Sequence, residues 1–451
     1  MKPHKTTQFE NLVAAAVAQH KAGRLPEAEA GYLAALQILP GHANVMHNLG
    51  VLAATKGDYV ASIERFNLSI RADPSYPLAH YGRAISFEAL GRRSEAIKDF
   101  ARTVALQPDH YASHRALGFL LMGQGSRGRA LDHFARTYEL RRGEDRTGIA
   151  SESLTSATRA KLLHDSEQFH YLALNRRDKC RFELLAKNYE AVGRNFPQTR
   201  AKLSDADQEL LGNDYNTAIH LIDAPETTGG AVRQRTDTDE ITRALGTDHN
   251  GAIYLDDFLS PQALSALKQY LLQSTIWHDF SHIDGFVASY LEDGLACPLL
   301  LQIADEIRQS FPELLEARPL SQAWAFKGLK PSASVDAHAD DAAISINFWV
   351  TPNQANRDLD RGGLIICRRP PPMDWQVKDY EGDHAGIADF MEKYADDMLV
   401  VPYRENRAVL FKSRLFHRSD VTQFANDYEN HRINVTMLFG RHESSNKKPL
   451  T

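Results

Sequence analysis

The sequence predicts a multidomain chain of α and β structure, with a superhelix of repeated helices followed by a β-barrel region braced by further helices. Two observations lead to this prediction. Glycine and proline recur at a constant interval through the first part of the chain, which is typical of stacked helical repeats. Later the chain changes to short apolar runs with alternating polar residues, bounded by turn residues, which is typical of strands. A length of 451 residues suits two or three domains.

The overall composition is that of a soluble globular protein, with 43% hydrophobic and 24% charged residues. The net charge of −6 argues against a nucleic-acid-binding protein. Cys180, Cys297 and Cys367 are scattered without disulfide or metal spacing, so we expect a reducing, cytoplasmic location. No stretch approaches the length of a membrane span, and the short apolar run 12–18 is interpreted as a repeat helix rather than a signal peptide.

The first predicted domain, residues 1–145, is periodic. Glycines and prolines recur at one constant interval, at Gly23, Gly57, Gly91 and Gly125 and at Pro40, Pro74 and Pro108. Small residues hold the same interval at Ala16, Gly50, Ala84 and Gly118 and at Ala28, Ser62, Ala96 and Ala130. Small residues let paired helices approach closely, and a proline ends the second helix of each pair. The pattern resembles the tetratricopeptide repeat, and we predict four stacked repeats, near 9–42, 43–76, 77–110 and 111–144.

Residues 146–245 are predicted to form a helical connector and a flexible loop. The segment 156–196 has the periodicity of two amphipathic helices, and 227–240 is polar and rich in turn residues. The third predicted domain, 246–445, opens with a strand that leads into a helix. Ser260 is placed to cap this helix, with Pro261 at the first helical position.

The functional prediction depends on the stretch 335–350, where His338 and Asp340 form a His-x-Asp pair at the start of a strand-like run. Residues i and i+2 of a strand point to the same side. We expect a third metal ligand at His417, far downstream of Asp340 and on a distant strand. Two histidines and one carboxylate on one side of a metal are the ligand set of non-haem Fe(II) oxygenases. Asp341 is the rival carboxylate, but at i+3 it faces away from His338.

Further strands follow this stretch. Gly362 and Gly363 lead into an apolar strand, and 401–417 is predicted to be a strand that delivers His417. The last predicted strand opens with Arg432, and alternation places Asn434 and Thr436 on the same face as Arg432. In the same way, Asn347 shares a face with Ser345 and Trp349.

The order His-x-Asp, His, Arg resembles the Fe(II)/2-oxoglutarate-dependent dioxygenases, especially the branch of prolyl hydroxylases and their bacterial relatives, over roughly 250–442. The resemblance implies a double-stranded β-helix, or jelly roll, with bracing helices. It also implies that His338, Asp340 and His417 are the catalytic iron ligands, with 2-oxoglutarate and O2 as cosubstrates.

The same resemblance implies that Arg432 pairs with the distal carboxylate of 2-oxoglutarate, which suits a planar fork of donors. Arg418 is an alternative, because the interval from His417 to Arg432 is longer than prolyl hydroxylases usually have. Asn347 and Asn434 are expected to be further cosubstrate contacts.

By analogy with collagen-type prolyl hydroxylases, which also carry such repeats, we expect hydroxylation of a peptide or protein recognised partly by the repeats. A polar and aromatic row is expected on their concave face: His47, Asn48, His80, Tyr81, His114 and Arg115. Two alternatives stay open. One is an oxygenase of a small metabolite or natural product whose repeats form a homodimer, and the other is a non-catalytic scaffold with a silent jelly roll. The insertion 372–398, with Trp375 and Tyr380, is expected either to cover the substrate or to pack on the surface.

Overall fold

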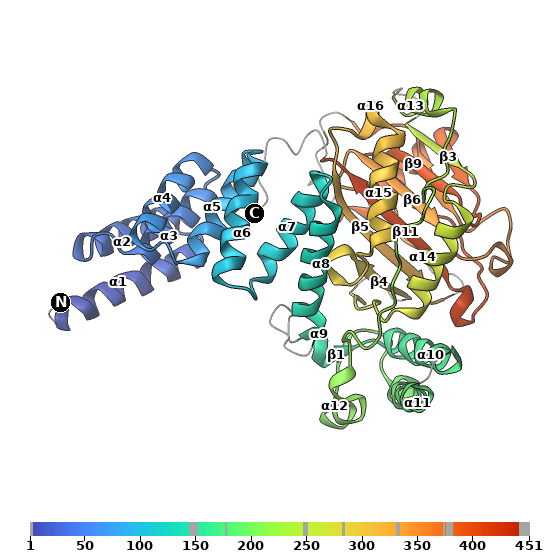
Figure 1. Cartoon of the computed structure of the whole chain (residues 1–451), viewed down its shortest axis with the longest axis horizontal. Helices are drawn as coiled ribbons and strands as arrows, with labels where there is room; N and C mark the ends of the chain where they lie inside the picture. The colour runs from blue at the N-terminus through green and yellow to red at the C-terminus, as the bar shows by residue number, and fades with distance from the viewer. Residues whose placement is uncertain are drawn as a thin grey trace. The chain divides into compact units, whose positions relative to one another are not determined.

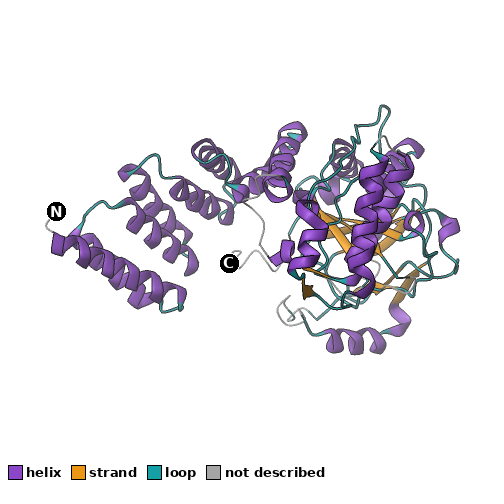
Figure 2. Cartoon of the chain, turned by 90° about the horizontal axis from the view of Figure 1, so that it is seen from below, coloured by secondary structure: helices purple, strands orange, loops and turns teal. Residues whose placement is uncertain are grey.

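The computed structural model describes residues 3–143, 152–175, 178–246, 251–281, 285–330, 334–372, 375 and 382–441. The chain divides into two compact units between Leu121 and Met122. Among the described residues, every strand lies in the second unit. Helices lie around these strands (Figure 2). No described helix is both long and apolar enough to cross a membrane.

The chain begins with eight helices, most of which lie in the first unit (Figure 1). The helices are α1 (Pro3–Lys21), α2 (Leu25–Ile38), α3 (Ala43–Thr55), α4 (Tyr59–Ala72), α5 (Pro77–Ala89), α6 (Arg93–Leu106), α7 (Tyr111–Gly123) and α8 (Arg127–Arg142). The first six pack as the pairs α1–α2, α3–α4 and α5–α6. Helix α8 packs within the second unit, against α15 (Pro298–Ser310) and η2 (Leu291–Asp293).

The sequence period corresponds to a repeated turn and a repeated core residue. The periodic glycines Gly23, Gly57, Gly91 and Gly125 have φ angles of 73°, 80°, 72° and 74°. Glycine adopts this left-handed conformation without strain, so each one lets the chain turn between two helices. One large aromatic ring per repeat is buried at the same interval: Tyr32, Phe66, Phe100 and Phe134. The ring of Phe66 occupies the space that a side chain at Gly50 or Gly82 would need.

Two members of the expected polar row contact the proline turn that ends the preceding repeat. His80 Nε2 lies 3.2 Å from the carbonyl oxygen of Pro74, and His114 Nε2 lies 3.2 Å from that of Pro108. His47 packs its ring against Phe66. His80 and His114 hold the proline turn to the helix that follows, which explains part of the periodicity of the row without a bound peptide.

The second unit contains a six-stranded sheet in the order β3–β9–β6–β11–β5–β4, visible in Figure 1, and a three-stranded sheet in the order β10–β7–β8. All neighbouring strands are antiparallel. The strands are β3 (Ala252–Leu255), β4 (Phe286–Tyr290), β5 (Leu320–Gly328), β6 (Ile344–Trp349), β7 (Leu364–Cys367), β8 (Met398–Val401), β9 (Ala408–Lys412), β10 (His417–Ser419) and β11 (Arg432–Phe439). The short strands β1 (Ser156–Ala157) and β2 (Ala201–Lys202) form a separate pair.

An apolar core joins the two sheets. Trp349 of β6 and Phe411 of β9 pack in one cluster with Leu364 and Ile366 of β7. Gly363 has no room for a side chain, because a Cβ there would overlap the carbonyl oxygen of Val401. The region is therefore rich in β-structure, with two antiparallel sheets around a common core.

Helices complete the second unit. They are α9 (Glu152–Thr155), α10 (Arg159–Asn175), α11 (Lys179–Asn195), α12 (Asp205–Leu211), α13 (Thr238–Gly246), α14 (Pro261–Gln273), α16 (Pro312–Leu315) and α18 (His384–Lys393). Short 3-10 turns are η1 (Gly212–Asp214), η3 (Asn353–Ala355), η4 (Ala395–Asp397) and η5 (Tyr428–Asn430). Ser260 caps α14, where its side chain accepts from the backbone N–H of Ala263. Helices α10 and α11 form the pair expected at 156–196 and share one apolar core.

Candidate metal centre

The structure brings His338, Asp340 and His417 together. The backbone N–H of His338 donates to the carbonyl of His417 over 3.0 Å, and the N–H of His417 donates back over 2.9 Å. This pairing places the two imidazole centroids 4.3 Å apart. One ligand atom from each of the three side chains lies within 4.8 Å of the others.

The local structure differs from the expected strands. His338 lies in an isolated bridge before β6, rather than within a regular strand, and Asp340 follows in irregular backbone. The segment 401–417 is interrupted by a turn after β9, and His417 starts β10 of the smaller sheet. Asp340 lies beside His338 because its backbone N–H donates to the carbonyl of Ser413 over 3.0 Å, which replaces regular strand pairing.

Both histidines are held by their Nδ1 atoms. His338 Nδ1 lies 2.8 Å from the carbonyl oxygen of Asp336, and His417 Nδ1 lies 3.0 Å from that of Leu415. An Nδ1–H that donates to a carbonyl leaves Nε2 with its lone pair, which is the usual arrangement of a metal-bound histidine. The two Nε2 atoms lie 3.8 and 3.7 Å from the two carboxylate oxygens of Asp340.

Asp340 is oriented by two buried hydroxyls. Ser345 donates to Asp340 Oδ2 over 2.6 Å, and the Oγ atoms of Ser345 and Ser413 lie 2.8 Å apart. Both serines have no exposed surface. Sequence reasoning did not assign a role to either serine. For Ser345, the one available signal was its place on the same face of β6 as Asn347 and Trp349.

The electrostatics favour a neutral His417. Its side chain is 3% exposed, whereas that of His338 is 36% exposed. Burial is the main cause that lowers the pKa of His417 to about 4, and His338 lowers it further while Asp340 opposes the shift. A neutral imidazole is the form that binds a metal. The donor set of two imidazoles and one carboxylate therefore fits a divalent transition metal, with His338 on the accessible side.

Arg432 opens β11, as expected, and it is 7% exposed. Its Nε donates to the carbonyl of Gly362 over 2.9 Å and its Nη2 to that of Gly363 over 3.3 Å, while Nη1 engages neither. Burial lowers the pKa of Arg432 to about 10, with Tyr403 and Asp420 acting in the opposite direction. Arg418, in contrast, is exposed on β10 and points to the opposite side from His417.

The other expected cosubstrate residues lie on one face of the large sheet. Asn347 pairs with Thr436, and Trp349 pairs with Asn434. Asn347 and Trp349 are 4% and 0% exposed, and Asn434 donates to the hydroxyl of Thr436 over 3.0 Å. Asn347 Oδ1 and Trp349 Nε1 have no hydrogen-bond partner among the described residues. This face therefore offers polar atoms close to the shared core of the two sheets.

The described residues of the insertion 372–398 pack beside the candidate metal centre. Trp375 contacts Phe390 of α18 and Phe416, with ring centroids 5.9 and 6.3 Å apart. His384 Nδ1 lies 3.4 Å from the carbonyl oxygen of Ala337. These contacts show that the described residues of the insertion pack against the rest of the unit. Tyr380 lies outside the described residues, so both expected roles of the insertion stay predictions.

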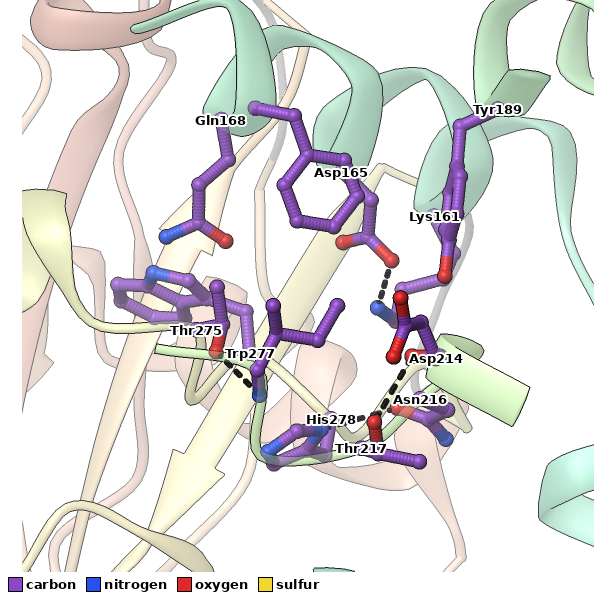
Figure 3. A pocket seen from close by; sticks show the side chains of 12 residues that line it. Lys161, Asp165, Gln168, Tyr189, Asp214, Asn216, Thr217, Thr275, Trp277 and His278 are labelled. Carbon is purple, nitrogen blue, oxygen red and sulfur yellow. Dashed lines mark hydrogen bonds and ion pairs between the residues drawn. The ribbon is translucent and has the colours of Figure 1, made fainter. Parts of the chain in front are cut away.

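A second group of buried polar side chains lies between α10 and the residues before β4 (Figure 3). Lys161 and Asp165, one turn apart on α10, form an ion pair. His278 Nδ1 lies 3.1 Å from Asn216 Oδ1. The cavity has a volume of about 10 Å³, which is room for about one water molecule. These side chains therefore support α10 and leave no space for an organic substrate.

Comparisons with known proteins concern the helical part of the chain. The model of the tetratricopeptide repeat family matches residues 13–77 and 81–145. The chain is similar to MamA from Desulfovibrio magneticus RS-1, with 21% identity, coverage of 30% of this chain and 77% of that chain, and a TM-score of 0.28. It is similar to a mutant O-GlcNAc transferase of Thermobaculum terrenum, with 24% identity, coverage of 31% and 28%, and a TM-score of 0.28.

A third similar structure is the first TPR domain of Spaghetti (RPAP3) bound to the HSP90 peptide SRMEEVD, with 20% identity, coverage of 26% and 94%, and a TM-score of 0.26. The comparison with curated proteins found no match. The repeat period, the helix pairs and the family model agree that the N-terminal region of this chain contains tetratricopeptide repeats.

Proposed function

We propose that this protein is an Fe(II)- and 2-oxoglutarate-dependent oxygenase that hydroxylates a peptide or protein. The observation that carries the proposal is the convergence of His338, Asp340 and His417, with both histidines fixed through Nδ1 and both Nε2 atoms turned towards Asp340. A structural histidine cluster does not require this common orientation. The two antiparallel sheets with a shared core are compatible with the jelly roll of this family.

The protein's own residues would have three tasks in this reaction. His338, Asp340 and His417 would hold Fe(II), and bound iron would supply the activation of O2 coupled to the decarboxylation of 2-oxoglutarate. Ser345 would keep the Asp340 carboxylate in one orientation. The accessible side at His338 would admit the substrate, while the apolar core behind His417 excludes water.

Arg432 is the best candidate to bind the distal carboxylate of 2-oxoglutarate. Its guanidinium is fixed by two backbone carbonyls and is buried, so a carboxylate that pairs with it would be shielded from water. Asn347 and Trp349 supply an acceptor and a donor without partners among the described residues on the same face of the sheet. We assign Trp349, together with Asn434, to the cosubstrate pocket, and not Asn347, because the unpartnered atom of Asn347 is an acceptor and 2-oxoglutarate has no N–H to donate.

The repeats support a protein or peptide partner, because tetratricopeptide repeats are stacked units whose extended surface typically binds such partners. His80 and His114 contribute to packing between neighbouring repeats, so the proposal depends on the repeat class and not on these two side chains. The scattered free cysteines support a cytoplasmic location. The scaffold alternative differs from this proposal in one testable respect, which is turnover.

The test is the release of CO2 from 2-oxoglutarate labelled at C1, measured with Fe(II) and ascorbate under air. We expect the intact chain to decarboxylate 2-oxoglutarate slowly without substrate. Asp340→Ala should abolish release, while the matched variant Asp341→Ala, which removes an exposed neighbouring carboxylate, should retain it. Equal release from both variants would contradict the assignment, and no release from the intact chain would favour the non-catalytic scaffold.

A further inference from the structure

A line of side chains crosses the six-stranded sheet from the metal side to its edge. Asn347 of β6 pairs with Thr436 of β11. Thr436 also pairs with Trp324 of β5, which pairs with Tyr290 of β4. Residues directly opposite in antiparallel strands point to the same face. Ser345, two positions before Asn347 on β6, donates to Asp340 of the candidate metal centre, so the line begins on that side.

The far half of the line is aromatic. The ring centroids of Trp324 and Tyr290 lie 6.4 Å apart, and Phe326 lies 6.1 Å from Trp324. Phe326 belongs to the neighbouring line, where it pairs with Asn434. All three rings are partly exposed. Large aromatic side chains that keep part of their surface accessible are typical anchors for protein ligands.

The near end of the line carries a buried acceptor without a donor. Asn347 is 4% exposed, and its Oδ1 has no hydrogen-bond partner among the described residues. A buried amide oxygen in this state is unfavourable, because it has lost its contact with water and has gained no donor in return. A ligand N–H removes this cost, so Asn347 is suited to bind a backbone amide.

The far end of the line opens into a cleft of about 260 Å³, to which Tyr290 contributes. Arg142 and Asp293 line the cleft and neutralise each other through two hydrogen bonds. Their side chains are each 3% exposed, so this pair forms the floor rather than a binding group.

The accessible charges of the cleft are mainly positive. The side chains of Arg141 and Arg200 are 24% and 38% exposed, and each lies near one carboxylate. Arg141 Nε is 3.7 Å from Asp293 Oδ1, and Arg200 Nη2 is 3.8 Å from Oε1 of the exposed Glu152. The remaining carboxylate, Asp279, accepts a hydrogen bond from the backbone N–H of Ser281. The cleft is therefore complementary to a carboxylate. Because both guanidinium groups are exposed, a bound peptide can continue beyond the cleft on either side of that carboxylate.

We propose that this line binds an extended segment of the protein substrate, with an acidic side chain of the segment in the arginine cleft. Three strand spacings separate Asn347 from Tyr290, which is roughly 14 Å, or about four residues of extended peptide. The acidic residue therefore lies about four to five positions from the residue that is oxidised. The inference rests on the proposed function for the reacting end, but binding along the line does not require iron.

The test starts with a random dodecapeptide library displayed on phage and selected on the intact protein. We expect enrichment of aspartate and glutamate. Selected peptides are then synthesised with amidated C-termini, and their Kd is measured by fluorescence polarisation. Trp324→Ala and Arg200→Gln should each weaken binding about tenfold or more, and Trp324→Phe should restore it in part. Tyr254→Ala, which truncates an exposed ring on β3 of the same sheet, is the matched control and should leave Kd unchanged.

Three results would overturn the proposal: a Kd that is equal for the wild type and Trp324→Ala, a Kd that is unchanged when the acidic residue becomes glutamine or asparagine, or binding that needs a free C-terminus. A selection without binders would overturn it as well. Intact peptide binding by a protein that fails to bind iron would instead contradict the proposed oxygenase function. It would still support the assignment of this line of side chains as a peptide-binding surface.

Discussion

His338 and His417 are joined by two backbone hydrogen bonds, of 3.0 and 2.9 Å, although they lie far apart in the chain. The bridge connects the segment before β6 with the first residue of β10, so it links the two sheets at the candidate metal centre. Because the link is made by the backbone, we expect the pairing to persist when either imidazole is removed. Variants of the two side chains therefore test metal binding separately from folding.

Ser345→Ala is expected to weaken Fe(II) binding. The variant removes the hydroxyl that donates to Asp340 Oδ2, so the carboxylate loses its fixed orientation. Loss of such an outer partner lowers metal affinity by about 10- to 100-fold. Anaerobic titration with Fe(II) measures this change. Ser321→Ala, which removes a hydroxyl bonded to the backbone of β11, is the control with unchanged affinity. Equal affinities of both variants would show that Ser345 is only a packing residue.

Arg432→Ala is expected to raise the Kd for 2-oxoglutarate and to leave Fe(II) affinity nearly unchanged. A carboxylate that loses its buried charged partner loses on the order of 2–5 kcal/mol. Isothermal titration of 2-oxoglutarate into the Mn(II)-loaded protein measures the effect. Arg418→Ala removes an exposed guanidinium and should bind normally. The reverse result, with normal binding by Arg432→Ala and weak binding by Arg418→Ala, would move the role to Arg418.

His164 is expected to make the fold sensitive to acid. Burial is the main cause that lowers its pKa from 6.5 to about 4. Between these pH values the unfolded chain binds a proton at His164 and the folded chain does not. The free energy of unfolding is therefore unaffected by His164 above pH 6.5. It decreases as the pH falls from 6.5 towards 4, by at most about 3 kcal/mol.

Urea unfolding at pH 7 and pH 5 measures this difference. His164→Asn should lose less stability between the two pH values than the wild type. His384→Asn, which replaces an exposed imidazole on α18, is the matched control and should keep the wild-type difference. If the two variants lose stability equally, His164 is not the group that titrates.

Gly82→Ala is expected to destabilise the repeats. A Cβ at Gly82 overlaps the ring of Phe66, and overpacking of this kind typically costs about 1–3 kcal/mol. At Gly128, which is also helical, a Cβ meets no atom within 4 Å, so Gly128→Ala should be neutral or slightly stabilising. Thermal unfolding followed by circular dichroism compares the two. A Gly82→Ala variant as stable as Gly128→Ala would contradict the packing described around Phe66.

The repeats could be predicted well because their signals are local. A glycine between two helices and a proline after the second describe backbone conformation within a short stretch of chain, and the positive φ angles at Gly23 and Gly57 have the corresponding local cause. The identity of the three clustered residues could also be predicted, since His-x-Asp and a distant histidine form a recognisable order. The structure brings these three residues together, although not through the regular strands that were expected, and their role as metal ligands stays a prediction.

The supporting residues could not be predicted, because each depends on a partner far away in the chain. Ser345 acts together with Ser413 of a different segment, and neither serine differs from an ordinary strand residue in sequence. Lys327 is fully buried on β5, where its ammonium lies over the ring of Tyr428, although lysine in a strand is normally exposed. Such positions are determined by tertiary packing and not by periodicity.

The most direct test of the central claim is anaerobic addition of Fe(II) and 2-oxoglutarate, followed by visible absorption. The wild type should bind one Fe(II) per chain and develop a weak charge-transfer band. His417→Ala and Asp340→Ala should lose both the band and the bound iron, while Asp341→Ala should keep them. An unchanged band and stoichiometry in His417→Ala and Asp340→Ala would contradict the assignment of these residues as the metal ligands.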